Sequence, residues 1–450
     1  MKHEKIILIL LVLFFLAQCI IFLIPADIWW DPAVYAGMGK YLFSGGSAGI
    51  WEPYRPVLWP FLLGFLWKLG ADPIGGGILL SILLGVLCVL LTFLISKRYF
   101  DTTTSLIAAA FLAFSPTFFL HAHLPFTELP ALFFILAALY FYPQKPQFAG
   151  LLMGLAILTR TYTAFAAVPL FIDLLLQFRK RIYKPAIMFA LSMVIPLISF
   201  LIFNQLMYGD PFYSFIEQVY MTKQVGWLWH QPWYYYLFGL FKENPLAVLM
   251  LPSIFLLSKK KHLPLLMFLF LVIPFFFIPQ KQMRVLLPAL PFFYMVIAAT
   301  LTSFIYKVKK HRIILITIGI LWAAWTIPYL DFNTYDDKND MYYEYVQNNE
   351  LRGTVWVSNP AYVVYSDYGA KLLYYPRFDS DKIKEIQETL TGNETILLNT
   401  CDIPCPPTEA QCESEKTLFI EELKKNYVLV KSETQWICEM YIFEPISSLS

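Results

Sequence analysis

A few charged residues could carry chemistry in this very apolar chain, because each lies at or near the end of an apolar segment. Asp31 follows the first apolar run, Glu128 precedes another, and basic side chains stand at Arg55, Arg160 and Arg284. A charge at membrane depth costs several kcal/mol unless it faces a cavity or a partner. Carboxylates can take a proton from a hydroxyl, and guanidinium groups bind phosphate through parallel hydrogen bonds. The set predicts acid–base chemistry beside a phosphate.

Simpler interpretations exist for several of these residues. Asp31 precedes Pro32 and could only cap a helix that begins there. Arg55 could contact lipid headgroups instead of a bound anion, and headgroups are the favoured partner of Lys281. Arg160 interrupts two apolar segments where membrane topology needs no basic residue, which favours a functional role.

The segment "HAHLPFTELP" places His121 and His123 close to Glu128. Two imidazoles and a carboxylate could bind a divalent metal ion, but three ligands are few and histidine is common at membrane interfaces. No cofactor is expected, and binding of a divalent metal ion is the alternative. Glu128 is more simply a partner of the Asp31 pocket.

The elements that must position these residues are apolar helices. The chain has 450 residues, 58% hydrophobic and 15% charged, with a mean hydropathy of +0.57. A soluble globular protein does not explain this excess, whereas a polytopic membrane protein does. About eleven membrane-spanning helices are predicted, near residues 4–24, 74–96, 103–120, 129–142, 148–158, 163–177, 185–205, 234–257, 263–279, 285–305 and 312–329.

The positive charges predict the orientation of these spans. Sixteen Lys and Arg residues fall on the predicted inner side, including the segments 179–184 and 259–261, against eight on the other side before residue 330. An excess of positive charge marks cytoplasmic loops. The N-terminus is therefore expected in the cytoplasm, and the candidate residues on the outer face of an integral membrane protein.

The first outer loop, residues 27–70, predicts two amphipathic helices. One begins at Pro32, ends at 45–46, and is expected to lie along the interface. Residues 57–69 are apolar but too short to span a bilayer, so they predict a helix embedded in the outer leaflet.

The composition changes after residue 330. Residues 331–450 hold 21 acidic and 10 basic residues, without a long apolar run. Short β-rich stretches alternate with the helical patterns "SDKIKEIQETL" and "TLFIEELKKN". The pattern predicts one α/β domain outside the cytoplasm, following an all-α membrane domain in residues 1–330.

Four cysteines in this domain favour an oxidising compartment and two disulfides. They are Cys401, Cys405, Cys412 and Cys438, and the sequence does not give their pairing. A zinc site in "CDIPCPPTEAQC" is the alternative, but its spacing matches standard zinc motifs poorly.

An ordered set of segments resembles the GT-C superfamily of membrane glycosyltransferases over residues 1 to about 330. The resemblance is to the family 39 type, which includes protein O-mannosyltransferases and the bacterial aminoarabinose transferase. The segments are "WWDPAVYAGMGKYLFSGG", "RPVLWPFLLGFLWKLG", "TELPALFFILAALYFY", "GLLMGLAILTRTYTAFAAVPL", "NQLMYGDPF" and "RVLLPALPFFYMVIAA".

The resemblance implies a catalytic aspartate at Asp31 and a polyprenyl-phosphate monosaccharide as donor, with its phosphate held by Arg160 and Arg284. Many members carry a second acidic residue where this chain has Pro32, so Glu128 is the expected substitute. The resemblance also implies that the sugar is transferred, with inversion at its anomeric carbon, to a hydroxyl of a protein, lipid or glycan acceptor. The expected partners are therefore the polyprenyl-phosphate-linked sugar, the acceptor and membrane lipids, and no nucleic acid is expected.

Two alternatives to this function remain. An oligosaccharide transferase or glycan polymerase of the same superfamily would use similar groups. A membrane transporter would also bury Asp and Arg between helices, but the chain shows no internal repeat of the kind common in transporters.

Overall fold

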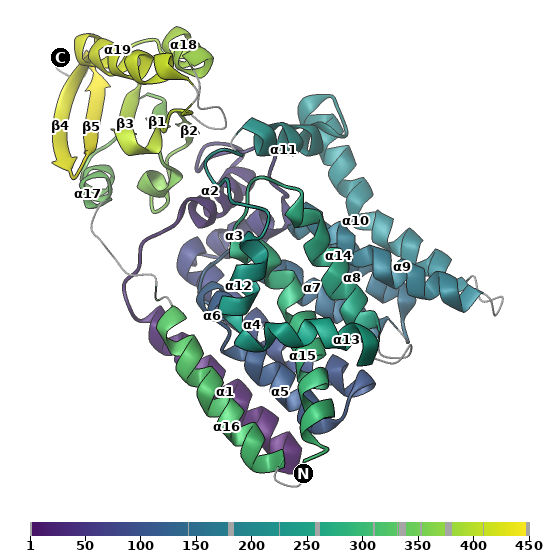
Figure 1. Cartoon of the computed structure of the whole chain (residues 1–450). Coiled ribbons are helices and arrows are strands. Elements are labelled where there is room, and N and C mark those ends of the chain that lie inside the picture. The colour runs from purple at the N-terminus through teal and green to yellow at the C-terminus, as the bar shows by residue number, and fades with distance from the viewer. Residues whose placement is uncertain are drawn as a thin grey trace.

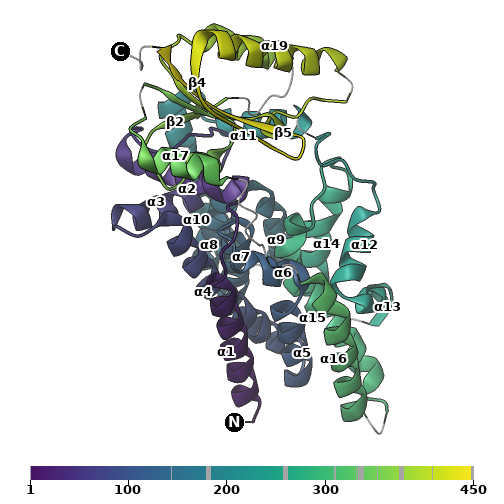
Figure 2. The same ribbon diagram turned by 90° about the vertical axis from the view of Figure 1, so that its left-hand side faces the viewer.

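The computed structural model describes residues 2–142, 144–178, 184–224, 226–256, 262–308, 311–330, 332, 339–351, 353–373, 380–407 and 409–446. Two of the basic segments behind the predicted orientation, 179–184 and 259–261, lie outside these residues except for Lys184. The N-terminus and the C-terminus lie at opposite ends of the molecule (Figures 1 and 2).

Helices make up the regular structure of the first 330 residues in the part of the chain that is described (Figure 1). In chain order they are α1 (Lys2–Phe22), α2 (Trp30–Ser44), α3 (Leu58–Lys68), α4 (Pro73–Tyr99), α5 (Thr102–Ala113), α6 (Pro116–His121), α7 (Glu128–Phe141), α8 (Pro146–Thr159), η1 (Thr161–Thr163), α9 (Ala164–Phe178), α10 (Lys184–Tyr208), α11 (Tyr213–Gln224), α12 (Tyr235–Glu243), η2 (Pro245–Leu249), α13 (Met250–Leu256), α14 (Leu263–Phe276), η4 (Met283–Ala289), α15 (Leu290–Ile305), α16 (His311–Thr326) and η5 (Ile327–Tyr329).

Each of the eleven predicted apolar segments is helical, but the helices differ in length. Among the described residues, four helices are long and apolar enough to cross a membrane: His3–Phe22, Pro73–Tyr99, Lys184–Tyr208 and Met283–Ile305. The pair 235–243 and 245–256 makes a fifth if it counts as one span bent by 114°. Six further apolar helices are shorter, with 10–17 residues each. The count of eleven spans therefore stays a prediction.

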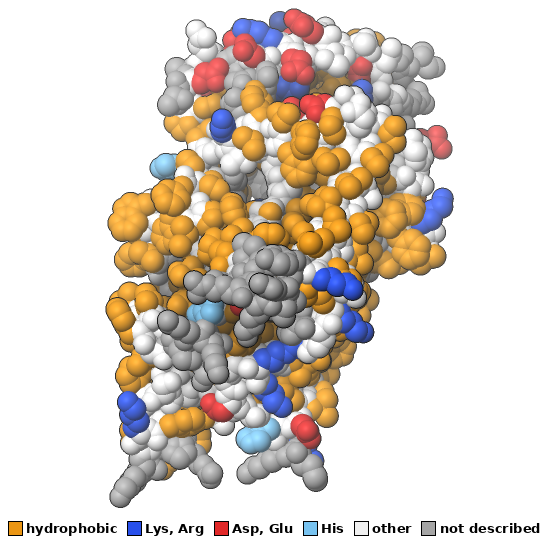
Figure 3. Space-filling view, turned by 90° about the vertical axis from the view of Figure 1, so that its right-hand side faces the viewer, with side chains coloured by type: hydrophobic (Ala, Val, Ile, Leu, Met, Phe, Trp, Pro, Cys, Tyr) orange, Lys and Arg blue, Asp and Glu red, His pale blue; other side chains and the backbone are white. Residues whose placement is uncertain are grey.

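The apolar helices indicate an integral membrane protein. A helix of 27 residues such as α4 is about 40 Å long, more than the roughly 30 Å of hydrocarbon in a bilayer. Hydrophobic side chains cover the middle of the surface, and acidic side chains gather at the end that the C-terminal domain forms (Figure 3).

The C-terminal domain contains a five-stranded mixed sheet with the order β2-β1-β3-β5-β4. The direction of strand pairing changes across the sheet. β1 pairs in parallel with β2 and β3, whereas β5 is antiparallel to β3 and β4. Its elements are α17 (Asp340–Asn348), β1 (Val355–Val357), η6 (Pro360–Val363), β2 (Ala370–Leu372), α18 (Ser380–Thr389), β3 (Thr395–Asn399), η7 (Thr400–Asp402), α19 (Ala410–Asn426), β4 (Tyr427–Gln435) and β5 (Cys438–Pro445).

Helices cover both faces of this sheet (Figure 2). The outer face packs under α18 and α19 through residues such as Ile386 and Phe419. The inner face packs against α17, η6 and α2, which contributes Val34 and Met38 to the same apolar cluster. The predicted α/β domain is therefore present, and α2, from the segment predicted as the first outer loop, completes one of its layers.

Both predicted disulfides are present. Cys401 is bonded to Cys438, and Cys405 is bonded to Cys412. These bonds occupy the four thiols, so the alternative zinc site is wrong. The first bond ties η7 to the beginning of β5, and the second closes a short loop at the start of α19.

The two helices of the first outer loop are present but differ in environment. α3 exposes Phe61 and Phe65 and buries Trp59 and Leu63, as expected for a helix at the edge of a membrane. α2 is buried continuously from Asp31 to Lys40. The C-terminal domain and α3 enclose α2, so it does not have the exposed polar face of a simple amphipathic helix, and its position along the membrane interface stays a prediction.

Candidate active site

Ends of helices bring together most of the charged residues singled out in the sequence. Asp31 lies in the first turn of α2, and Glu128 is the first residue of α7. Arg160 is the extended residue between α8 and η1, and Arg284 lies in η4 just before α15. Arg55 lies in the loop between α2 and α3. A helix end orients a side chain rigidly without placing its charge in the apolar middle of the bundle.

Two arginines bind the carboxylate of Asp31 from opposite sides. Arg55 Nη2 lies 2.7 Å from Asp31 Oδ1, and Arg284 Nη1 lies 2.5 Å from Asp31 Oδ2. The predicted role of Asp31 as a helix cap is wrong, since α2 begins at Trp30 and its N-cap residue, Trp29, makes no side-chain cap. The carboxylate is used for tertiary contacts.

These contacts set the protonation state of Asp31. Burial by itself raises the pKa of Asp31, but Arg284, Arg55 and Arg160 together hold that pKa well below its ordinary value. A neighbouring positive charge stabilises the carboxylate relative to the acid. Asp31 is therefore an anion at neutral pH, able to accept a proton but weakly basic while both arginines remain bound.

Glu128 forms a second ion pair beside the first. Its Oε1 lies 3.1 Å from Arg160 Nη2 and 3.8 Å from Arg284 Nε, and the side chain is completely buried. Arg160 also donates to Thr127 Oγ1 at 2.9 Å and to the hydroxyl of Tyr35 at 3.4 Å. Arg284 thus contacts both predicted acidic residues.

Glu52 and Tyr54 complete the arrangement and were not singled out in the sequence. Glu52 Oε2 lies 2.7 Å from Arg55 Nε and accepts from the hydroxyl of Tyr54 at 2.5 Å. Burial raises the pKa of Glu52, although Arg55 and the Tyr54 hydrogen bond act against this. The spacing of Glu52 three residues before Arg55 in "WEPYR" was the available signal. The six ion-paired residues, hereafter the acid–arginine network, are Asp31, Glu52, Glu128, Arg55, Arg160 and Arg284.

Arg55 and Lys281 differ from what the headgroup interpretation predicts. Arg55 is buried and ion-paired, so a contact with lipid headgroups is wrong for it. Lys281 is 5% exposed and donates to the carbonyls of Gln231 and Ile278. Its described contacts do not join it to the acid–arginine network, so they give no support to a role in binding the donor phosphate.

The two histidines do not form a metal site with Glu128. The Nδ1 of His121 lies 2.8 Å from the carbonyl of Thr117, and that of His123 lies 3.1 Å from Gln18 Oε1. Within the described residues, no group of three or more His, Cys, Asp or Glu side chains could hold a metal ion. Burial lowers the pKa of each histidine to about 4, so both are neutral at physiological pH.

The exposed fractions of the three arginines suggest where a ligand could approach. The side chains of Arg160 and Arg284 are 19% and 17% exposed, while Arg55 is 10% exposed. Three guanidinium groups face three carboxyl groups, so the network can exchange an internal carboxylate for an external anion. It combines a potential proton acceptor with a potential binding site for phosphate.

Comparisons with known proteins concern the family and the fold of the chain. A family model for dolichyl-phosphate-mannose-protein mannosyltransferases matches residues 54–203, a segment that includes Arg55, Glu128 and Arg160. A comparison with curated protein sequences finds no match.

Solved structures match over a larger part of the chain. ArnT from Cupriavidus metallidurans bound to undecaprenyl phosphate has a TM-score of 0.70 at 10% identity, covering 98% of each chain. An oligosaccharyltransferase from Archaeoglobus fulgidus in complex with zinc and sulfate has a TM-score of 0.60 at 12% identity, covering 86% of this chain and 67% of that one. The archaeal AglB in complex with an inhibitory peptide and a dolichol-phosphate has a TM-score of 0.58.

The predicted resemblance to GT-C glycosyltransferases is confirmed by these matches. At such low identities, the solved structures show that the fold is shared. The likeness to ArnT extends over the C-terminal domain as well, beyond the 330 residues for which the sequence predicted it.

Proposed function

We propose that this chain is an inverting glycosyltransferase, which moves a monosaccharide from a polyprenyl-phosphate donor to an acceptor hydroxyl on the outer face of the membrane. The acid–arginine network is the observation that carries the proposal. It places an ionised carboxylate against two guanidinium groups at the ends of apolar helices, in a fold shared with a protein crystallised with undecaprenyl phosphate.

Arg160 and Arg284 are the proposed contacts of the donor phosphate. They are the two more exposed arginines of the network, and both lie at breaks in apolar helices. A polyprenyl chain in the membrane holds its phosphate near the bilayer surface, where such helix ends lie. The planar guanidinium group suits phosphate because it donates two parallel hydrogen bonds and stays charged.

Asp31 is the proposed general base. The acceptor hydroxyl gives its proton to a carboxylate oxygen of Asp31 while its own oxygen attacks the anomeric carbon. The bond from that carbon to the phosphate oxygen breaks, and its electron pair leaves with the phosphate, whose charge the arginines stabilise. A single displacement of this kind inverts the anomeric carbon.

The ion pairs of Asp31 imply that donor and base are coupled. While Arg284 and Arg55 bind the carboxylate, its affinity for a proton is low. A donor phosphate that binds Arg284 competes with Asp31 for the same guanidinium group. Binding of the donor therefore makes Asp31 more basic at the moment when a base is needed.

Arg55 and Glu128 are the proposed positioning residues. Arg55 is fixed by Glu52 and by the hydroxyl of Tyr35, so it can orient Asp31. Glu128 holds Arg160 and lies 3.8 Å from Arg284, so it can fix the spacing of the two phosphate contacts. Glu128 is proposed to take the place of the second acidic residue, because Pro32 occupies that position beside Asp31.

We propose a monosaccharide donor because the ordered segments of residues 1 to about 330 resemble the family 39 type. The alignment covers 98% of ArnT and 69% of AglB. A transporter commonly places its binding groups near the midplane between repeated halves, whereas this network lies at the ends of helices.

The proposal can be tested with the purified full-length protein in lipid vesicles that contain a radiolabelled polyprenyl-phosphate monosaccharide. Wild-type protein with an acceptor extract should form a labelled product and release an equal amount of polyprenyl phosphate. Asp31→Asn should lower this rate at least about 100-fold, the usual scale for loss of a general base.

Transport gives a different result in the same vesicles. Labelled donor that crosses the bilayer without releasing polyprenyl phosphate would support the transporter and refute the transferase. Lys68→Gln is a matched control at a basic residue of the first outer loop, outside the network, and should leave the rate unchanged.

A further inference from the structure

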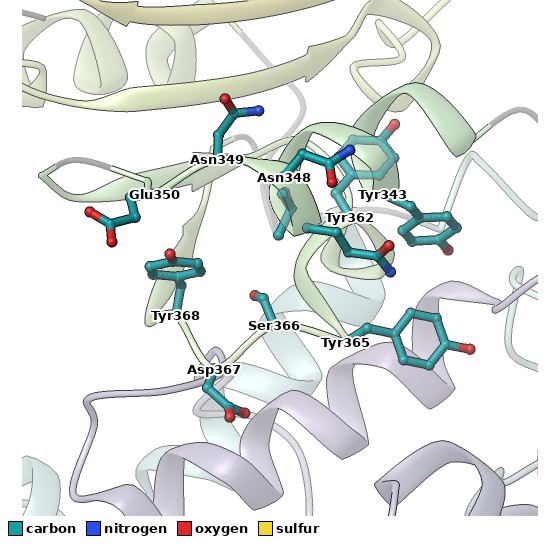
Figure 4. Close-up of a pocket in the computed structure, with 11 residues that line it drawn as sticks. Tyr343, Asn348, Asn349, Glu350, Tyr362, Tyr365, Ser366, Asp367 and Tyr368 are labelled. Atoms are coloured by element: carbon teal, nitrogen blue, oxygen red, sulfur yellow. The ribbon is translucent and has the colours of Figure 1, made fainter.

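A cavity in the C-terminal domain is separate from the acid–arginine network. Its volume is about 360 Å³, within the usual range for small-molecule sites. One side is formed by the end of α17 and the residues after it, and the other by the loop from η6 to β2 (Figure 4).

The lining combines flat aromatic rings with many hydrogen-bonding groups. Tyr365 and Tyr368 come from one loop, with their rings at opposite ends of the cavity and the ring of Tyr365 turned outward, while Asn348, Asn349 and Glu350 come from the other side (Figure 4). Tyr365 is 51% exposed, so its ring is accessible to a ligand. Tyrosine supplies a large, rigid and amphipathic contact surface.

The charge of the cavity restricts its ligand. The described lining residues include the carboxylates of Glu350 and Asp367 but no Lys or Arg, and Lys40, outside the lining, pairs with Asp367, which leaves Glu350 as the carboxylate without an ion pair among the described residues. Asp72 lies near enough to Tyr365 to act on its pKa, which burial and this carboxylate raise to about 12. Phosphate and other anions are disfavoured in such surroundings, in contrast to the acid–arginine network.

We propose that this cavity binds a neutral or amino-bearing oligosaccharide, the part of the acceptor glycan that does not react. Aromatic rings can stack on the apolar face of a sugar, and the amide and carboxylate oxygens accept hydrogen bonds from its hydroxyls. No described lining residue belongs to a strand, so the cavity does not offer the strand addition by which extended peptides often bind.

The length of α2 argues for an oligosaccharide over a single sugar. Asp367 at the edge of the cavity lies 3.3 Å from Lys40, and Asp31 lies nine residues earlier on the same helix. At about 1.5 Å per residue, Lys40 and Asp31 are about 14 Å apart along the axis. A sugar in the cavity is too far from Asp31 to react, so the reactive hydroxyl belongs to another sugar of the chain. This inference rests on the proposed function.

Binding of three neutral trisaccharides, triacetylchitotriose, maltotriose and mannotriose, tests the proposal on the full-length protein in nanodiscs by saturation-transfer NMR and calorimetry. At least one of them should bind, and Tyr365→Ala should weaken that binding at least tenfold. Tyr365→Phe keeps the aromatic ring and should bind the trisaccharide as the wild type does. Trp436→Ala is the matched control, since Trp436 is an exposed aromatic residue of the same domain but does not line the cavity.

Several outcomes would overturn the proposal. They are no binding of any neutral trisaccharide, equal binding of the anionic trigalacturonic acid, binding of a serine-rich hexapeptide in place of the sugars, or no effect of Tyr365→Ala. Asp31→Asn should bind the trisaccharide as the wild type does. Binding of the trisaccharide is measured separately from sugar transfer. A protein that binds the trisaccharide but transfers no sugar would therefore refute the proposed function and not the binding site.

Discussion

At the scale of single residues, the acid–arginine network is a set of charges that depend on one another. Glu128 is completely buried, and Arg160 is its nearest cationic partner, at 3.1 Å. Removal of one member of a buried ion pair leaves the other charge without compensation, which is far more costly than removal of both. A variant that lacks one arginine can therefore be compared with a variant that also lacks the charge of its partner. This comparison separates the function of the arginine from its contribution to stability.

We expect Arg160→Ala to destabilise the protein by about 3–5 kcal/mol, because the carboxylate of Glu128 loses its partner. The double variant Arg160→Ala with Glu128→Gln should recover most of this stability. Both variants should bind polyprenyl phosphate more weakly than the wild type. Thermal unfolding in detergent and binding of undecaprenyl phosphate measure the two effects. Normal lipid affinity in the double variant would make Arg160 a packing residue only.

The buried histidines predict a dependence of stability on pH. Burial lowers the pKa of His121 and His123 from 6.5 to about 4, with Glu128 acting against this at His121. The unfolded chain therefore binds protons below about pH 6.5 that the folded chain excludes until about pH 4. Stability falls as the pH falls through this window, by about 2 kcal/mol per histidine at pH 5.

The measurement is the melting temperature at pH 7 and pH 5 for the wild type and for His121→Gln with His123→Gln. The double variant should lose much less stability on acidification. Asp31 also destabilises in acid, but only below its ordinary value of 3.8, outside this range. Equal losses in both proteins would show that the histidines do not titrate as inferred.

At the scale of elements, the position of Asp31 depends on close packing between α2 and α3. A Cβ atom added at Gly64 would lie 2.3 Å from the carbonyl oxygen of Gly39 and 2.6 Å from its carbonyl carbon. These contacts are to backbone atoms, which cannot rotate away. The two glycines let the helix that carries Asp31 lie directly against α3.

Gly64→Ala should therefore displace α2 and lower the transfer rate at least tenfold, with a lower melting temperature. Gly319→Ala in α16 is the control, because a Cβ there meets nothing within 4 Å. That variant should be neutral or slightly stabilising, by up to about 1 kcal/mol. Similar behaviour of the two variants would exclude the proposed helix contact as the cause.

Elements were predicted from sequence far better than the contacts between them. Apolar runs gave the helices, and β-rich stretches such as "TILLNT" gave strands of the C-terminal domain. The signal before Pro32 predicted a cap at Asp31, but Arg284, some 250 residues later, binds that carboxylate. Local pattern cannot report which distant charge competes for a side chain. For the same reason, the sequence did not predict the burial of Lys281 or the contact of α2 with the sheet.

At the scale of the whole molecule, Lys40 joins the membrane part to the C-terminal domain. It is 3% exposed and donates to the carbonyls of Val364 and Ser366, besides its ion pair with Asp367. These partners lie more than 320 residues away in the sequence. The C-terminal domain therefore holds the helix that carries Asp31.

Lys40→Met should lower both stability and transfer, because the buried carbonyl of Val364 loses its donor at a cost of about 1–3 kcal/mol. Asp367→Asn is the matched control for stability alone, because that side chain is 73% exposed and both carbonyl contacts remain, whereas its place in the cavity lining excludes it as a control for transfer. Thermal unfolding and limited proteolysis of the C-terminal domain report the change. An intact domain with normal activity in Lys40→Met would refute this coupling.

The central claim is that Asp31 is the base and that the donor phosphate competes with it for Arg284. Parallel measurement of single-turnover transfer and of undecaprenyl-phosphate affinity in Asp31→Asn tests this most directly. Transfer should fall at least about 100-fold, while the lipid phosphate binds as tightly as in the wild type or more tightly, because the arginines are released. Unchanged transfer, or loss of affinity together with activity, would contradict the claim.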